Sequence, residues 1–271
     1  MIAIGRMLRN LPGAAIRYRG LVRAIVAREL IGRYSGSLLG PLWLIIPPVF
    51  MIFIYTVIFS QVMHSRLPGN NDTFGYSIYL CAGLLVWTPF LDAMQRAKNV
   101  FIEHANLIKK SAFPRSILFV PVAVVAAINF ILLAIAFLGF LLITRGLPAP
   151  ALAWIPVCAA LAACLGLAVG AILAVLNVFF RDVGQVADLA AQLLFWATPI
   201  VYPASILPPA VLDLMGFNPL FPLVRISQNV ALDSGALDGH TLLLPLLGTV
   251  IAGVLAVLLF SRARADLMDQ L

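Results

Sequence analysis

The feature that most constrains this chain is a series of long apolar segments without charge. The longest runs from Ile117 to Ile143, where Asn129 is the one polar side chain. At about 1.5 Å per residue, a helix of this length exceeds the roughly 30 Å hydrocarbon core of a bilayer. Such runs favour membrane-spanning helices over the weaker alternating pattern of a membrane barrel. Only 11% of all residues are charged, against roughly 25% in soluble proteins. The pattern therefore predicts an all-α polytopic membrane protein.

Six segments are predicted to be transmembrane helices. In chain order they cover residues 38–63, 76–95, 117–143, 152–176, 186–201 and 242–260. Pro47 and Pro48 lie near the middle of the first segment and are expected to distort its helix, which a bundle tolerates where neighbours satisfy the freed carbonyls. Gly166 and Gly170 in the fourth segment permit close helix packing.

A proline-rich region separates the fifth and sixth segments. The apolar pieces between Pro199 and Pro222 are shorter than the roughly 20 residues that a crossing needs. Residues 203–232 are therefore predicted to form re-entrant half-helices on the outer side. All of the 18 lysines and arginines except Arg66, Arg145 and Arg225 then fall on the other side. Because cytoplasmic segments carry the excess of basic residues, both termini are predicted to be cytoplasmic.

The chain is predicted to consist of a basic cytoplasmic arm at residues 1–37 and a transmembrane domain at residues 38–271. An apolar row in the arm, formed by Val22, Val26 and Leu30, is interrupted by Glu29. This pattern is typical of an amphipathic helix in the membrane interface. The alternative is a disordered basic tail held by anionic lipid. The net charge of +7 reflects topology in this interpretation, and nucleic acid is not an expected partner.

The longest polar interruption between two apolar segments covers residues 96–115. A helical reading places on one face the polar residues Asn99, Glu103, Asn106 and Lys110, and on another the apolar residues Phe101, Ala105 and Ile108. Pro114 disfavours helical geometry in the residue before it and so ends this helix. We expect a short two-faced helix at the cytoplasmic surface, with a solvated loop as the alternative.

The sequence contains no group that could supply energy for transport. A phosphate-binding loop needs the pattern GxxxxGK[ST], and none of the lysines (Lys98, Lys109 and Lys110) follows a glycine. No series of acidic or histidine residues in the predicted spans suits a proton relay. Neither metal-ligand spacing nor a catalytic residue is found. A nucleotide site must therefore come from another polypeptide.

Six stretches in register carry a resemblance to a known family. They are RYSGSLLGPLW (33–43), AGLLVWTPF (82–90), HANLIKKSAFPR (104–115), LNVFFRDVG (176–184), ATPIVYP (197–203) and NPLFPLVRISQNVAL (218–232). Together they resemble the membrane subunit of ABC-2 type exporters, specifically the O-antigen, capsular polysaccharide and teichoic acid export permeases. The resemblance implies a multi-pass subunit in the bacterial inner membrane that exports a lipid-linked polysaccharide. The alternatives are an ABC-2 exporter of a drug or small lipid, and a membrane enzyme or ion-gradient carrier.

The resemblance also implies partners and site residues. The permease would form a homodimer, contact membrane lipid and bind two copies of a cytoplasmic ABC ATPase, which would hold ATP and Mg while this chain holds no cofactor. Residues 96–115 would form the coupling loop, and the loop at residues 177–185 would approach the same partner. The implied coupling residues are Asn99, Glu103, His104, Asn106, Leu107, Arg115, Arg181 and Asp182.

Five aromatic residues are candidates for the path of the glycan. Trp87, Phe90, Phe195, Trp196 and Tyr202 offer apolar faces against which sugar rings can slide. Packing, or a belt at the membrane interface, is the alternative role. A hydrated polysaccharide is too wide for a bundle packed to protein density, so the path is expected between two subunits.

Overall fold

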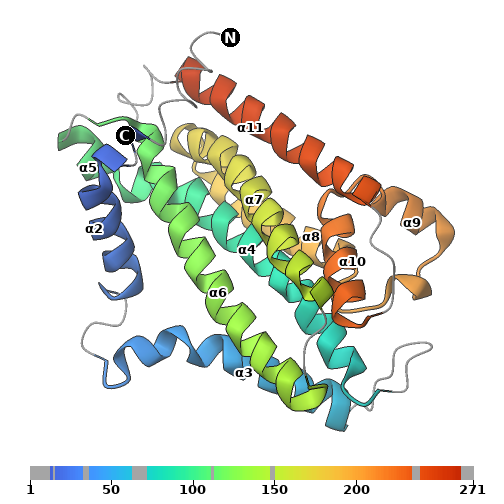
Figure 1. The fold of residues 1–271 in the computed structure, drawn as a ribbon. Helices are drawn as coiled ribbons and strands as arrows, with labels where there is room; N and C mark the ends of the chain where they lie inside the picture. The colour runs from blue at the N-terminus through green and yellow to red at the C-terminus, as the bar shows by residue number, and fades with distance from the viewer. Residues whose placement is uncertain are drawn as a thin grey trace.

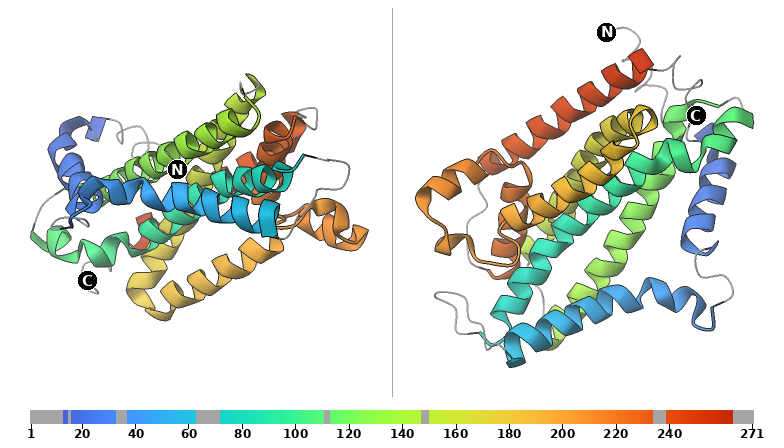
Figure 2. Two further views of the ribbon diagram at one scale, coloured as in Figure 1. Left: turned by 90° about the horizontal axis from the view of Figure 1, so that it is seen from below. Right: turned by 180° about the vertical axis from the view of Figure 1, so that it is seen from behind.

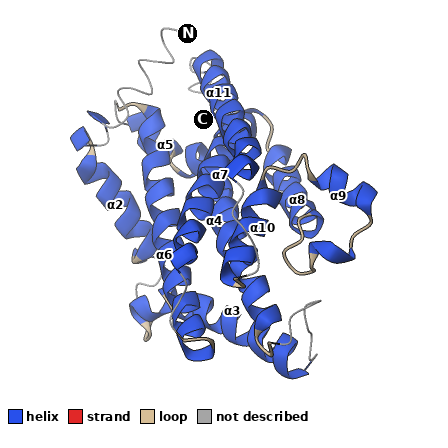
Figure 3. Ribbon diagram, turned by 45° about the vertical axis from the view of Figure 1, so that its right-hand side comes forward, coloured by secondary structure: helices blue, strands red, loops and turns tan. Residues whose placement is uncertain are grey.

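The computed structural model describes residues 13–14, 16–32, 37–62, 72–110, 113–146, 150–233 and 239–263. These residues form helices and no strands (Figures 1 and 3), which confirms the predicted all-helical class for this part of the chain. The α-helices are α2 (Arg19–Leu30), α3 (Ile46–Thr56), α4 (Gly75–Glu103), α5 (Ala105–Lys110), α6 (Phe119–Thr144), α7 (Trp154–Phe179), α8 (Asp182–Ala197), α9 (Pro209–Met215), α10 (Leu220–Ala231) and α11 (Leu243–Ala263).

Shorter helical turns connect several of these helices. They are η2 (Gly40–Leu44), the π-helical η3 (Val57–Val62), η4 (Arg115–Leu118), η5 (Pro150–Ala153), η6 (Ala204–Ile206) and η7 (Gly239–Leu242). Parts of the arm, of the first resemblance stretch and of the coupling loop (residues 1–12, 33–36 and 111–112), together with Arg66, lie outside the described residues.

Four helical segments in the described part of the chain are long and apolar enough to cross a membrane. They cover residues 75–103, 115–144, 150–179 and 243–263, and they correspond to the second, third, fourth and sixth predicted segments. The stretches predicted as the first and fifth crossings form shorter helices. The prediction of a polytopic helical protein is therefore confirmed at this coarser level.

Helix α4 is the centre of the bundle (Figures 1 and 2). Of the four long segments, α4 is the least hydrophobic. Nevertheless, 83% of its most apolar stretch is buried inside the bundle, against 39% of that stretch in the α6 and α7 segments and 22% in α11. The largest interface of α4 is with α7. A Cβ atom at Gly166 of α7 would overlap the Phe90 carbonyl oxygen, and one at Gly170 would lie 2.6 Å from the Ala97 Cβ. These two glycines therefore allow the two backbones to approach closely, as the sequence indicated.

The first predicted segment differs from the helix that was expected. Gly40, with a positive φ of 47°, begins a 3-10 turn, and α3 begins only at Ile46. Pro47 and Pro48 thus lie in the first turn of α3 and do not distort the middle of a longer helix. Proline is tolerated there because the first N–H groups of a helix lack intrahelical acceptors. Helix α3 runs across one end of the bundle (Figure 1) and packs on α6 and α4.

The fifth predicted segment forms α8, which has 16 residues. At about 1.5 Å per residue, it is shorter than the roughly 30 Å core of a bilayer. Thr198 is extended (φ −94°, ψ 129°) and ends α8, as expected for a residue that precedes proline. Beyond this break, two short helices, α9 and α10, occupy the region predicted to hold half-helices, and α10 packs on α4 and α7.

The segments predicted to face the cytoplasm gather at one end of the bundle, which we call the inner end (Figures 1 and 2). Phe101 of α4 stacks there on Phe260 of α11, with ring centroids 5.8 Å apart. At the opposite end, Arg145 pairs with Asp72 at 2.6 Å and donates to the Ala231 carbonyl at 3.2 Å. One side chain thus joins the end of α6, the start of α4 and the end of α10.

Candidate coupling interface

The predicted coupling loop begins inside α4. This helix continues to Glu103, past the predicted end of the second span at Gln95, and a turn at His104 (φ −108°, ψ 18°) separates it from α5. The single amphipathic helix that was expected is therefore two helical pieces. The break lies at residue 104, where the chain leaves helical geometry before α5 starts at Ala105.

The two predicted faces are still present on either side of this turn. Phe101 is 1% exposed and Ile108 is 5% exposed. Glu103, Asn106 and Lys110 are exposed to solvent. The apolar face thus attaches the coupling element to the bundle, and the polar face remains open at the surface.

The turn is built around a buried histidine. His104 is 7% exposed, and its Nδ1 lies 3.0 Å from the Val100 carbonyl oxygen. A carbonyl oxygen only accepts hydrogen bonds, so this contact places a proton on Nδ1. None of the described residues donates to this buried Nε2. His104 therefore stabilises the turn through one nitrogen and leaves the other unsatisfied.

A groove separates α2 from α5. Its volume is about 540 Å³, and it is lined by Leu21, Ala24, Ile25, Arg28, Glu103, His104, Asn106, Leu107 and Lys110. Leu107, another predicted coupling residue, is half-buried in the wall of this groove. The lining combines apolar side chains with charges of both signs, a composition that suits contact with a protein.

A buried lysine joins the inner end of α4 to the start of α8. The Lys98 side chain is 4% exposed, and its ammonium lies 2.5 Å from the carboxylate of Asp188. The same ammonium donates to the Gly184 carbonyl oxygen at 2.9 Å. An unpaired ammonium in this position would be costly. These two contacts therefore attach α8 to α4.

Asn177 links the same region from the end of α7. Its Nδ2 donates to the Lys98 carbonyl and to the Asn99 side-chain oxygen, both at 3.3 Å. Its Oδ1 accepts from the Gly184 amide at 3.1 Å. These hydrogen bonds hold the loop at residues 177–185 directly against the inner end of α4. The two segments that sequence reasoning assigned to one partner are therefore neighbours.

The other predicted coupling residues lie at the surface of the inner end. Arg181 and Asp182 are exposed at the start of α8, and Asp182 in the first turn suits the positive end of the helix dipole. Arg115 is half-buried in η4, directly after the extended Pro114. The described residues contain no group of three or more His, Cys, Asp or Glu side chains that could hold a metal ion.

The five aromatic residues predicted for the glycan path form a cluster that extends to the surface. Trp87 is 5% exposed and Phe90 is 3% exposed. The Trp87 ring lies 5.3 Å from that of Phe195, which in turn lies 5.6 Å from that of Trp196. Trp196 is 58% exposed, and Tyr202, half-buried, donates to its carbonyl at 2.7 Å. Trp87 and Phe90 are covered by the rest of this chain, and a path along this cluster stays a prediction.

One polar network at the inner end was found only in part from the sequence. The helical ion pair of Asp92 and Arg96 is present at 2.7 Å. Arg96 also pairs with Glu29 of α2 at 3.2 Å, and Asn129 of α6 donates to Asp92 at 2.9 Å. Glu29 and Asn129 are each the polar exception in an apolar pattern. That exception is the signal that each needs a polar partner.

A further network, which sequence reasoning missed, fixes the chain break after α8. The Tyr79 hydroxyl lies 3.2 Å from the Pro199 carbonyl oxygen and 3.1 Å from that of Tyr202. Gln228 of α10 also donates to the Pro199 carbonyl, at 3.1 Å. Helical hydrogen bonding stops at this break, so the backbone carbonyls of Pro199 and Tyr202 have no helical donor. The side chains of Tyr79 and Gln228 supply donors instead.

Known proteins are similar to this chain over most of its length. Residues 20–232 match the family model described as ABC-2 type transporter. The chain is 30% identical over 205 residues to a protein named O-antigen export system permease protein RfbA from Klebsiella pneumoniae, which spans 75% of this chain and 77% of that protein. It is 29% identical over 249 residues to a protein of the same name from Myxococcus xanthus, which spans 91% of each chain. The family match includes both predicted coupling segments.

Proposed function

Because this chain belongs to the ABC-2 type transporter family, we propose that it is the permease subunit of an ATP-driven exporter of a lipid-linked polysaccharide. Relatives that are named O-antigen export permeases align over as much as 91% of the chain, and their names favour a glycan over a drug or small lipid. The chain itself is a multi-pass membrane protein and a transport subunit. Its described helices, four of which have the length and apolarity of spans, support that role.

The observation that carries the mechanism is the contact between the two coupling segments. Lys98 pairs with Asp188 and donates to Gly184, so the inner end of α4, which precedes α5, and the start of α8 would move as one unit. An ATPase that pulls on the exposed face of α5 would then displace α8 as well. Because α8 carries Phe195 and Trp196, the displacement would reach the aromatic cluster.

ATP and its magnesium ion are bound by a partner in this proposal. The three lysines of the chain do not follow a glycine, so no phosphate-binding loop of the P-loop type is present in the sequence. Two cytoplasmic ATPase subunits would dock on the inner end of two permease copies. Glu103 and Asn106, both exposed, would meet the partner, and Arg181 and Asp182 would form the second contact.

The membrane arrangement that we propose has six crossings in the bacterial inner membrane. The stretches that form α3 with η3, and α8, would complete the set begun by the four long segments. Helices α9 and α10 would re-enter from the outer side. The basic residues of the inner end, including Lys109, Lys110 and Arg262, support a cytoplasmic location for both termini.

The glycan would cross between two copies of the chain. A single protomer packs its aromatic residues Trp87 and Phe90 into the interior, which leaves no wide channel at that depth. The surface of α8 offers exposed apolar side chains instead, among them Leu189, Leu193 and Trp196. Two such faces that meet could enclose a hydrated polymer and give it weak, sequence-tolerant contacts.

The test is a charge reversal at the centre of the coupling face. The permease is co-expressed with its ATPase partner, and the purified complex is placed in proteoliposomes with the lipid-linked glycan. We expect ATP-dependent transfer of the glycan by the parent and none by Glu103→Arg. The reversed charge would repel the ATPase, which could then not transmit its closure on ATP to the permease. Membrane insertion of the variant should be normal.

The matched control reverses a charge at the opposite end. Asp213→Arg changes an exposed acidic residue of α9 and should retain the ATPase. Normal export by Glu103→Arg would contradict the coupling role. Transport of a small lipid or drug without glycan transfer by the parent complex would instead support the alternative cargo.

A further inference from the structure

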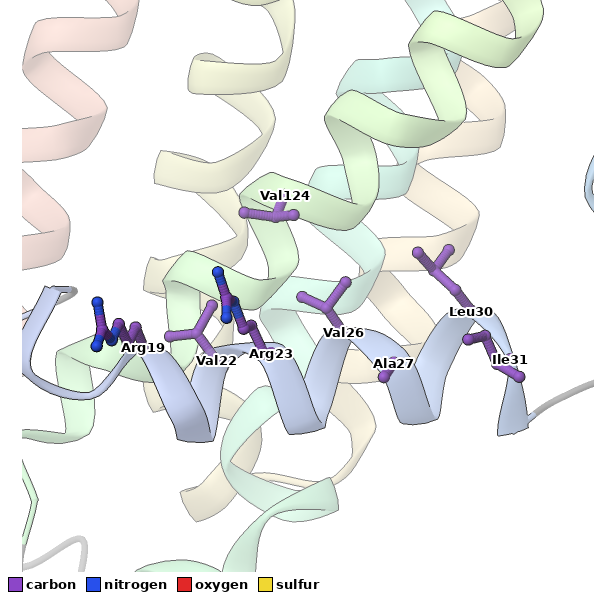
Figure 4. Close-up of a pocket in the computed structure, with 8 residues that line it drawn as sticks. All are labelled: Arg19, Val22, Arg23, Val26, Ala27, Leu30, Ile31 and Val124. Carbon is purple, nitrogen blue, oxygen red and sulfur yellow. The ribbon is translucent and has the colours of Figure 1, made fainter.

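An open groove lies between α2 and α6 (Figure 4). Its α2 residues differ from those that line the groove beside α5, so it lies on another side of α2. The two helices are close at the inner end of the bundle and diverge toward α3, as both Figure 1 and Figure 2 show. The groove has a volume of about 560 Å³, and its lining consists of Arg19, Val22, Arg23, Val26, Ala27, Leu30, Ile31 and Val124.

The lining is divided along the axis of α2 into a cationic end and an apolar end. Arg19 and Arg23 lie in the first half of the helix, and Leu30 and Ile31 lie at its end (Figure 4). The two arginines are the charged groups of this lining, and both are exposed. The ion pairs of the described residues involve neither of them. The groove therefore offers two positive charges beside a purely apolar surface.

The apolar end of the groove continues along α6. Val124 begins a row of exposed large apolar side chains on that helix, which proceeds through Ile131, Ile135, Leu138 and Leu142. Their spacing of seven, four, three and four residues keeps them on one face. An exposed row of this kind on a membrane-spanning helix faces lipid tails. The groove is thus the inner end of a lipid-facing surface.

We propose that this groove binds an anionic phospholipid of the inner leaflet. The lipid phosphate lies between Arg19 and Arg23, and one acyl chain runs over Val26 and Val124 onto the apolar row of α6. The orientation is consistent, because the cationic end of the groove is at the inner end of the bundle and the apolar end points into the span. A peptide fits less well, because the apolar end has no side-chain donors or acceptors to satisfy its backbone.

Binding is tested with the full-length permease in complex with its ATPase. The purified complex is titrated with phosphatidylglycerol, and retained lipid is counted by native mass spectrometry, with phosphatidylcholine, whose zwitterionic headgroup has no net charge, as the comparison. Arginines near anionic headgroups each contribute about fivefold in affinity, so Arg19→Gln with Arg23→Gln should weaken phosphatidylglycerol retention roughly thirtyfold. Retention of phosphatidylcholine should change little.

Two further variants separate a built groove from general charge attraction. Arg28→Gln removes a positive charge from the other side of α2, where it lines the α5 groove, and should leave phosphatidylglycerol retention at the parental level. Val124→Trp fills the apolar end while both arginines remain, and should abolish retention of this lipid. Equal losses for the Arg19/Arg23 and Arg28 variants, or unchanged retention with Val124→Trp, would overturn the proposal. Each variant is compared with the parent for monodispersity before titration.

Discussion

At the scale of single residues, the Lys98 pair shows an asymmetry that can be measured. Lys98 is 4% exposed, whereas its partner Asp188 is 52% exposed. Loss of the aspartate leaves a buried ammonium with only the Gly184 carbonyl, whereas loss of the lysine leaves a carboxylate that water can reach. Removal of one partner of a buried pair costs about 3–5 kcal/mol when the remaining charge stays buried.

We therefore expect Asp188→Ala to destabilise the protein more than Lys98→Met does. The measurement is the apparent melting temperature of each variant in mild detergent, followed by size-exclusion chromatography. Arg262→Met, which removes an exposed basic residue at the inner end, is the control for loss of charge alone. Equal melting temperatures for the Asp188 and Lys98 variants would mean that the pair is not buried in solution.

Residue patterns predicted local contacts and missed distant ones. Asp92 and Arg96 are four residues apart on one helix, so their ion pair follows from helical spacing. Arg96 also reaches Glu29, and Lys98 reaches Asp188, but these partners come from helices whose arrangement no local pattern specifies. The sequence does indicate that such partners exist, because charges near the end of an apolar segment need neutralisation. It does not indicate which residues supply it.

At the scale of elements, the close approach of α4 and α7 makes a testable packing prediction. Gly166→Ala would place a Cβ against the Phe90 carbonyl oxygen, a backbone atom that cannot rotate away. The helices must then separate, at a cost of about 1–3 kcal/mol. We expect the Gly166→Ala variant to melt at a lower temperature than the parent. At equal expression, a smaller fraction of the variant should be monodisperse.

The control is the same substitution on a different helix. Gly139→Ala on α6 meets no atom within 4 Å, and alanine favours a helix over glycine by about 1 kcal/mol. Its melting temperature should be equal to that of the parent or higher. A Gly166→Ala variant as stable as Gly139→Ala would show that the α4–α7 interface tolerates expansion.

The sequence predicted where helices lie better than it predicted where they are interrupted. Long apolar runs gave α6 and α7, since burial and length leave few alternatives for them. Pro47 and Pro48 were expected to bend a helix but instead begin one, because a 3-10 turn from Gly40 precedes them. His104 ends α4 without a proline or glycine, so no local sequence signal marked that turn.

At the scale of the whole molecule, the orientation of the bundle is open to direct labelling. In a chain from which Cys81, Cys158 and Cys164 have been removed, we expect Asp213→Cys to react with a membrane-impermeant maleimide in intact spheroplasts. Lys109→Cys should react only after permeabilisation, because the inner end carries the excess of basic residues. Both positions are exposed, so detergent-solubilised protein serves as the control for reactivity. Labelling of Lys109→Cys from outside would invert the proposed topology.

The burial of α4 has a consequence for how the chain is made. Of the four long segments it is the least hydrophobic and the most buried, yet the ribosome delivers it before α6 and α7, which later surround it. Arg96 follows its partners Glu29 and Asp92 in the chain, but Lys98 enters the translocon before its partners Gly184 and Asp188 have been translated. Charged residues at the middle of an inserting helix cost about 2.5–3.5 kcal/mol each, and less near its ends. A nascent chain that stops after α6 would therefore remain with insertion factors or be degraded, and the bundle can close only after α8 has emerged.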